Sequence, residues 1–201
     1  MQDCEQRQST PAFYSGFGIS RKVGTSFSVI AALVVAGFFL GATPGAAADC
    51  AGLANLTLKE TKITSATVIA AEGKVPEYCK VLGSLHNLPH STIQFEISMP
   101  TTQWNGKYFV AGGGGYNGVI PRLNQALTEG YAAAGSDTGH DAKDTNWALN
   151  NLDAQNNYAY LATHVLTVIG KEILRTYYNQ HERRSYFVGC SNGGKMALAE
   201  V

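Results

Sequence analysis

The alternation of apolar and polar positions predicts a sheet for most of the chain. Residues 92–99 alternate strictly, and this pattern is typical of a half-buried antiparallel strand near the edge of a sheet. Further strands are predicted at 63–70, 80–86 and 107–111. The small residues 130–136 fit the centre of a parallel sheet that is covered on both faces.

Helical periodicity appears in two places, at 121–129 and, over the longest stretch, at 158–179. In the second, the side chains that recur with a helical period are Leu161, Val165, Val168, Ile169, Glu172 and Ile173. We expect its apolar stripe to pack on the sheet. His164 lies among these residues, and a histidine in that setting is expected to be part of the core. Residues 144–157 are polar, with Trp147 as their anchor, and 182–184 read as a solvated turn.

The last predicted strand, 186–188, runs into a motif that is typical of a catalytic serine. Ser191 has a glycine two residues before it and another two residues after it, and the helix-forming segment 195–200 follows. A tight strand-to-helix turn lifts the serine hydroxyl out of the sheet, and the glycines remove Cβ atoms that would clash. The helix start directs N–H groups at the place where an oxyanion would form. This context favours a nucleophile over an ordinary glycine-rich turn.

A cluster of glycines, 112–115, follows the strand at 107–111 and allows three interpretations. It could be a loop that cradles a phosphate, but the Lys-Ser/Thr ending and a Gly-x-Gly-x-x-Gly pattern with a downstream acid are missing. It could be an oxyanion loop, whose backbone must approach a substrate carbonyl closely. It could also be a flexible loop. The serine motif downstream favours the oxyanion loop.

Asp137 and His140 lie at the end of strand 130–136, where ligand-binding residues of parallel sheets gather. Both precede Ser191, whereas in hydrolases with this serine turn the acid and the histidine follow the nucleophile. We therefore expect them to brace the loop through hydrogen bonds. No group of His, Cys, Asp or Glu residues has the spacing of a metal site.

Residues 1–48 are predicted to be an N-terminal extension and signal peptide, followed by a mature domain at 49–201. Arg21 and Lys22 precede an apolar run at 27–40, and an Ala-x-Ala site ends at Ala48. The run is short for a membrane span of about 20 residues. A retained anchor stays an alternative, but export to a secreted or periplasmic location, with no membrane contact after cleavage, is the prediction.

Charge and cysteine content bear on partners and on disulfides. The chain has 15 basic and 15 acidic residues, so no net field would recruit nucleic acid. Three cysteines remain after cleavage, and an oxidising compartment favours disulfides. Cys50 and Cys79 can form a local bridge. Cys190 is then either a buried thiol or half of a bridge to a cysteine elsewhere.

Four segments, in order, resemble the tannase and feruloyl esterase family of secreted α/β hydrolases. They are residues 104–108, the glycine run ending in Tyr116-Asn117-Gly118, the segment 136–140, and 184–195. The last is the most specific, because a cysteine directly before the serine is a mark of the family. The resemblance extends over nearly all of the chain from Cys50 onward.

The resemblance implies an α/β-hydrolase fold, with a mostly parallel sheet and helices on both faces, of which 49–201 is the N-terminal part. It implies that Ser191 is the nucleophile and that the backbone N–H groups of Asn192 and Gly114 form the oxyanion hole. Cys190 would bridge to a cysteine beside the catalytic histidine, beyond residue 201. Cys50 and Cys79 match a disulfide near the family's N-terminus.

In the family, the catalytic acid, the histidine and a lid domain that often binds calcium lie beyond the position of residue 201. No cofactor is expected within this chain, and 1–201 alone is expected to be inactive and poorly folded. The implied activity is hydrolysis of small aromatic or plant cell-wall esters through a serine acyl-enzyme, with a feruloyl, galloyl or related aromatic acyl group. Two alternatives stay open: a non-catalytic relative or binding module that keeps only the scaffold, and another serine acyl hydrolase such as a lipase or thioesterase.

Overall fold

The structure is a computed structural model that describes residues 49–200. The predicted extension and signal peptide, residues 1–48, lie outside the described residues. Among the residues that are described, no helix is both long and apolar enough to cross a membrane.

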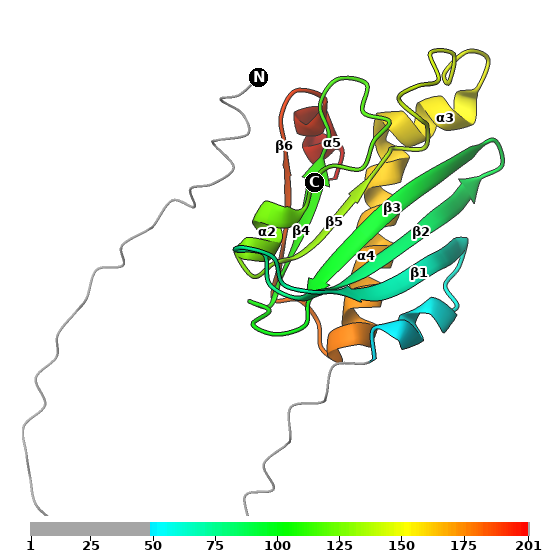
Figure 1. The fold of residues 1–201 in the computed structure, drawn as a ribbon. Coiled ribbons are helices and arrows are strands. Elements are labelled where there is room, and N and C mark those ends of the chain that lie inside the picture. Colours follow the sequence, from blue (N-terminus) through cyan, green and yellow to red (C-terminus); the bar gives the residue numbers. More distant parts are fainter. Residues whose placement is uncertain (1–48, 201) are drawn as a thin grey trace, which may run out of the picture. The chain divides into compact units, whose positions relative to one another are not determined.

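Six strands form one sheet, shown in Figure 1. Their bounds are β1 (Thr61–Ile69), β2 (Tyr78–Leu88), β3 (Ser91–Pro100), β4 (Lys107–Gly112), β5 (Ala132–Ser136) and β6 (Arg184–Gly189). The helices are α2 (Asn124–Thr128), α3 (Leu152–Asn156), α4 (Ala162–Tyr178) and α5 (Asn192–Glu200), together with the 3-10 helix η1 (Ala51–Asn55) and the π-helical turn η2 (Asn157–Leu161). The helix predicted at 121–129 is thus only five residues long.

The order of the strands is β1-β2-β3-β5-β4-β6, so β5 is inserted between β3 and β4. The first three strands and β5 pair antiparallel, whereas β5, β4 and β6 pair in parallel. The prediction that 92–99 lies near an edge is wrong, because β3 is the third strand of six and lies in the middle of the sheet. Its alternation correctly identified the buried face, but a period of two carries no information about lateral neighbours.

The three parallel strands end at the same edge of the sheet. Gly112, the last residue of β4, pairs with Gly189, the last residue of β6. Ala111 pairs with Gly135 near the end of β5. This register brings three segments to one end of the described domain (Figure 1). They are the glycine loop (residues 112–118), the segment after β5, and the serine turn (residues 189–193).

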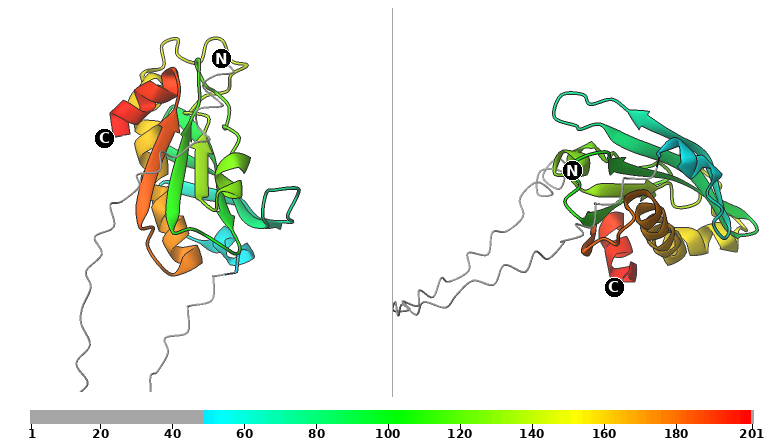
Figure 2. Two further views of the ribbon diagram at one scale, coloured as in Figure 1. Left: turned by 90° about the vertical axis from the view of Figure 1, so that its left-hand side faces the viewer. Right: turned by 90° about the horizontal axis from the view of Figure 1, so that it is seen from below.

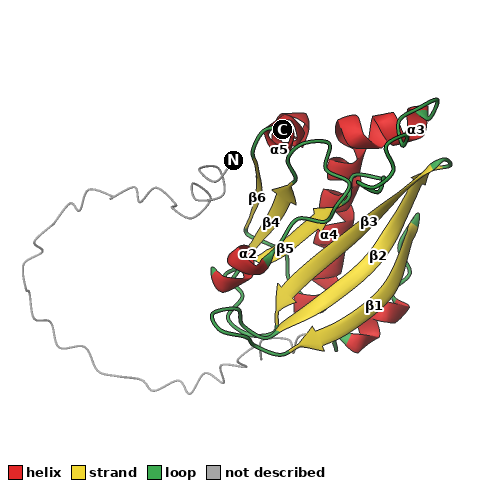
Figure 3. Ribbon diagram, turned by 45° about the horizontal axis from the view of Figure 1, so that its top comes forward, coloured by secondary structure: helices red, strands yellow, loops and turns green. Residues whose placement is uncertain are grey.

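Helices cover both faces of the parallel half of the sheet. Figure 2 shows α4 and α5 on one face and the short α2 on the other, and Figure 3 shows the same arrangement by secondary structure. The main core lies between α4 and the sheet. The buried apolar residues of α4 include Leu166, Ile169, Ile173, Leu174 and Tyr177.

The predicted stripe of α4 is therefore only partly right. Ile169 and Ile173 are buried, but Val168 is 42% exposed. His164 is not a core residue: its side chain is largely exposed, with Nδ1 3.6 Å from Oε2 of Glu200. The predicted solvated turn at 182–184 is also wrong in part, because the Glu182 side chain is mostly covered beside Lys171.

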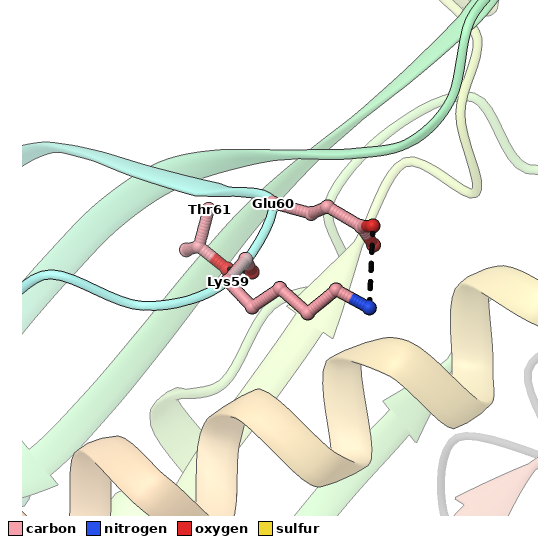
Figure 4. Close-up of polar contacts among 3 residues, drawn as sticks. All are labelled: Lys59, Glu60 and Thr61. Carbon is pink, nitrogen blue, oxygen red and sulfur yellow. Dashed lines mark hydrogen bonds and ion pairs between the residues drawn. The ribbon is translucent and has the colours of Figure 1, made fainter.

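The N-terminal part of the described chain is held by the predicted disulfide. Cys50 and Cys79 are bonded, with their Cα atoms 5.7 Å apart, and this joins η1 to β2. The turn that leads into β1 is tight, with Glu60 at φ 53°. There an exposed ion pair joins Lys59 Nζ to Glu60 Oε1 at 3.5 Å (Figure 4). Such surface pairs contribute little to stability.

Candidate active site

Ser191 lies on the predicted tight turn between β6 and α5. Its φ is 56°, in the left-handed region that L-residues other than glycine rarely adopt. The helix begins at once: the N–H groups of Gly194 and Lys195 donate to the Ser191 carbonyl oxygen, at 3.0 and 3.2 Å. The predicted order of strand, turn and helix is confirmed, and the serine itself is exposed. Backbone strain of this kind is concentrated at functional sites.

Glycines are required here because the backbones of three elements nearly touch. A Cβ on Gly189 would lie 2.6 Å from the Cα of Gly193. A Cβ on Gly193 would lie 2.7 Å from the carbonyl oxygen of Gly112. The two glycines of the serine motif therefore avoid Cβ atoms that would clash, as the sequence predicted. Gly112 at the end of β4 takes part in the same close contact.

The glycine loop lies beside the serine turn. The side-chain amide of Asn192 donates to the Gly113 carbonyl oxygen at 3.4 Å. A Cβ on Gly114 would be 4.0 Å from the Cys190 carbonyl oxygen, an ordinary contact. The structure thus brings together the two residues that the sequence proposed for an oxyanion hole, Gly114 and Asn192. Their role as donors stays a prediction.

Asn117 fixes the other side of the glycine loop. It is buried, has φ 57°, and donates from Nδ2 to the Ser136 carbonyl oxygen at 3.0 Å and to Thr138 Oγ1 at 3.4 Å. Its Oδ1 lies where a Cβ on Gly113 would be. Asn117 therefore ties the loop to the end of β5. The sequence analysis included Asn117 in a motif that resembles the family, but it did not predict the structural role of its side chain.

Asp137 braces its loop as predicted. Its Oδ1 accepts the N–H groups of Gln94, at 3.0 Å, and Gly139, at 2.8 Å. Burial raises the pKa of the carboxyl group to about 6, although these N–H groups act in the opposite direction. The Asp137 carboxylate is thus stabilised by two N–H donors but lies where little water can solvate it.

His140 braces the same region by stacking and not by hydrogen bonds. Its ring is buried and lies 3.8 Å from that of Trp147, nearly parallel to it, so Trp147 is the anchor that was expected. Neither ring nitrogen has a hydrogen-bond partner in the described part of the chain, so that prediction for His140 is wrong. Burial lowers its pKa, more than the nearby Tyr116 and Thr138 carbonyl groups raise it.

The sequence analysis did not predict an aromatic cluster that extends from His140 and Trp147 to α5, the helix that follows Ser191 and is called the serine helix below. Tyr158, in η2, contacts both rings, with centroids 5.8 and 5.1 Å away. Lys195 of α5 donates from Nζ to the Tyr158 carbonyl oxygen at 2.9 Å. No sequence pattern connects these positions, because four separate segments contribute one residue each.

A complete catalytic triad is not present in residues 49–200. None of the histidines in that range forms a hydrogen bond with Ser191, and no group of three or more His, Cys, Asp or Glu residues there could hold a metal ion. The catalytic acid and histidine, the calcium of a lid domain and a partner of Cys190 beyond residue 201 stay predictions.

The fold and the geometry define the class of protein. A mixed sheet with helices on both faces, and a serine on a strained strand-to-helix turn beside a glycine-rich loop, define an α/β hydrolase. Residues 79–201 match the family model described as tannase and feruloyl esterase. The chain belongs to this family, as its motifs predicted.

Individual relatives agree with this assignment. The chain is 33% identical over 124 residues to a probable feruloyl esterase B-2 of Aspergillus flavus, an alignment that covers 61% of this chain and 24% of the relative. It is 35% identical over 170 residues to an uncharacterised esterase of Xanthomonas campestris, covering 78% and 30%. The crystal structure of feruloyl esterase B from Aspergillus oryzae superimposes with a TM-score of 0.66 at 24% identity, covering 73% and 32%. The chain thus spans about a quarter to a third of the length of these relatives.

Proposed function

We propose that this chain is the nucleophile-bearing part of an exported serine carboxylic ester hydrolase that cleaves phenolic esters. The observation that carries the proposal is the position of Ser191, at φ 56° on the turn between β6 and α5, beside the glycine loop. Membership of the family and relatives named feruloyl esterase support an aromatic acyl group of the feruloyl or galloyl type. 

The proposed mechanism uses Ser191 as the nucleophile. The hydroxyl oxygen of Ser191 attacks the ester carbonyl carbon and forms a tetrahedral intermediate. We infer that the N–H groups of Asn192 and Gly114 stabilise its oxyanion. Loss of the alcohol leaves an acyl-serine, which water then hydrolyses. A general base is needed in both steps, and we infer that it comes from residues outside 49–200.

Export is the second element of the proposal. The Cys50–Cys79 disulfide supports an oxidising compartment. Cleavage after Ala48 would place Asp49 at the new N-terminus, one residue before the first cysteine of that bridge. Intact mass and N-terminal sequencing of protein recovered from the culture medium or periplasm test this point. A product that retains residues 1–48 would contradict it.

The activity is tested on the full-length protein that contains this chain. We expect hydrolysis of methyl ferulate or methyl gallate, and Ser191→Ala should lower kcat by at least about 10³-fold, as the loss of a nucleophile does. Ser185→Ala, an exposed serine at the start of β6, is the matched control and should retain activity.

Two outcomes would contradict the proposal. If Ser191→Ala kept wild-type activity, the hydrolysis would come from another group. If the full-length protein hydrolysed neither ester, and was not labelled at Ser191 by a fluorophosphonate, it would be a non-catalytic member of the family that keeps only the scaffold. Residues 49–201 produced alone should hydrolyse neither ester, because no described histidine contacts Ser191.

A further inference from the structure

A single tyrosine connects the serine helix to the glycine loop. Lys195, in the first turn of α5, donates from Nζ to the carbonyl oxygen of Tyr158 at 2.9 Å, and its ammonium group lies 3.9 Å from the centroid of the Tyr158 ring. The hydroxyl group of the same tyrosine donates to the carbonyl oxygen of Gly115 at 3.4 Å. Segments more than thirty residues apart in sequence are thereby joined.

The contact of Lys195 is unusual for a lysine near the surface. Fixing this long side chain costs rotamer entropy, and an ammonium group is normally well hydrated. Partial burial removes some of this hydration and lowers the pKa of Lys195. A hydrogen bond to a carbonyl group and a cation–π contact together offset these costs.

Tyr158 is itself held firmly. It lies in η2, and π-helical turns often occur at functional sites. Its ring contacts Trp147 and His140, which are stacked on each other. The orientation of the phenol group is therefore fixed mainly by residues outside the glycine loop, and the ring of Tyr116, which follows the glycines, lies 6.3 Å from it.

The glycine loop needs such support on the side of the serine helix. Pairing between β4 and β6 ends at Gly112 and Gly189, so the loop beyond this point has no strand ladder. Its glycines have no side chains to pack. Asn117 holds the loop to β5, and on the other side the described polar contacts are the 3.4 Å bond from Asn192 to Gly113 and the bond from Tyr158 to Gly115.

We propose that Lys195 and Tyr158 are positioning residues, which set the distance between the N–H groups of Asn192 and Gly114 at the oxyanion hole. This inference rests on the proposed ester hydrolase function, and neither residue is assigned contact with the substrate. Lys195 and Asn192 lie in the same helical turn, while the phenol group contacts the loop one residue after Gly114. Breaking either contact lets the two halves of the hole move apart.

The expected effect is on the chemical step. Oxyanion-hole donors act at about 2.7–3.1 Å from the developing charge, and a misplacement of about 1 Å can lower the rate by about 100-fold. We therefore expect Lys195→Met, which keeps the aliphatic stem, to lower kcat by about 10- to 100-fold. Tyr158→Phe, which removes only the long bond to Gly115, should lower kcat by about 3- to 10-fold. KM should stay within about twofold for both, since a ground-state carbonyl gains less from these donors.

The variants are made in the full-length protein that contains this chain, and methyl ferulate hydrolysis is measured. Lys143→Met and Tyr160→Phe are the matched controls, because both side chains are exposed and neither has a described contact with the glycine loop. Lys195→Arg should recover most of kcat, since a guanidinium group can also donate to a carbonyl oxygen and lie over an aromatic ring. Rescue by arginine would not be expected if the lysine only filled space.

A second readout separates positioning from a general structural role. Phenylboronic acid forms a tetrahedral adduct with a catalytic serine, whereas ferulic acid binds as a product. Lys195→Met and Tyr158→Phe should raise the Kd of phenylboronic acid by about the factor by which kcat falls, and leave the Kd of ferulic acid unchanged. If Lys195→Met does not fold, as judged by thermal melting, Tyr158→Phe carries the test, because it removes one partly exposed oxygen atom.

The outcomes are distinct. If Ser191 is required for activity but both variants match their controls in kcat and boronate binding, the inference is overturned and the proposed function stands. The same holds if KM and the Kd of ferulic acid change as much as kcat does. If wild-type activity and boronate binding survive Ser191→Ala, the proposed function itself fails, and the oxyanion hole with it.

Discussion

Replacing Gly193 by alanine tests the contact on which the candidate site is built. The new Cβ would lie 2.7 Å from the carbonyl oxygen of Gly112 and 2.9 Å from its carbonyl carbon. An ordinary contact begins near 3.4 Å, so the start of α5 and the end of β4 must separate by about 0.7 Å. Because Gly112 is paired to β6, it cannot easily yield, and the serine turn should move instead.

Two effects should follow from this displacement. The first is a fall in kcat of about 10- to 100-fold, since the turn carries both Ser191 and the N–H group of Asn192. The second is a loss of about 1–3 kcal/mol of stability from the overlap, reduced by up to about 1 kcal/mol because alanine favours a helix more than glycine does. Ester hydrolysis and thermal melting of the full-length protein measure the two effects.

Gly194 provides the matched control, because it is the next residue of the same helix. A Cβ there would meet only the Gly189 carbonyl oxygen, at 3.7 Å. Gly194→Ala should therefore keep its activity and melt at the same or a slightly higher temperature. If Gly193→Ala behaved like Gly194→Ala in both assays, β4 and α5 would not approach as closely as the structure has them, and the reasoning would be refuted.

Two further predictions concern stability. Burial raises the pKa of Asp137 from 3.8 to about 6, so the folded state binds this proton more tightly than the unfolded chain does. The contribution of Asp137 to the free energy of unfolding is therefore fully present below pH 4 and is lost as the pH rises through 6, by about 2–3 kcal/mol. Urea unfolding between pH 4 and 7.5 should show this loss in the wild type but not in Asp137→Asn, and equal slopes in both would contradict it. The Cys50–Cys79 disulfide closes a loop between cysteines 29 residues apart. Removing it should lower the free energy of unfolding by about 2–4 kcal/mol. A melting temperature that is the same with and without a reductant would argue against that contribution.

The arrangement of the site follows from the parallel register of three strands. Because β4, β5 and β6 end at the same edge, the loops that follow them meet, although 76 residues separate Gly113 from Gly189 in the sequence. The glycine loop, for which the oxyanion loop was favoured among three interpretations, lies beside the serine turn, and its role as an oxyanion loop stays a prediction. The contact of Asn192 with Gly113 is a direct link between the two motifs.

Local patterns predicted the elements well and their neighbours less well. The alternation in 92–99 identified the buried face of β3 but not its place inside the sheet. The helical period of 158–179 located α4, yet Val168 is exposed and His164 faces Glu200. Periodicity reports which side of an element is apolar on average, whereas burial depends on which helix or strand covers that side.

By itself, the sequence determined the serine turn and the family, and it offered Cys50–Cys79 as a possible bridge that the structure then showed. The turn and the family depend on motifs of fixed spacing, where backbone geometry leaves few choices. Only the tertiary structure decided the insertion of β5 between β3 and β4, the bracing of the glycine loop by Asn117, and the contact between Lys195 and Tyr158. These depend on residues that are far apart in the chain, and their meeting is set by the order and register of the strands, which no local pattern contains.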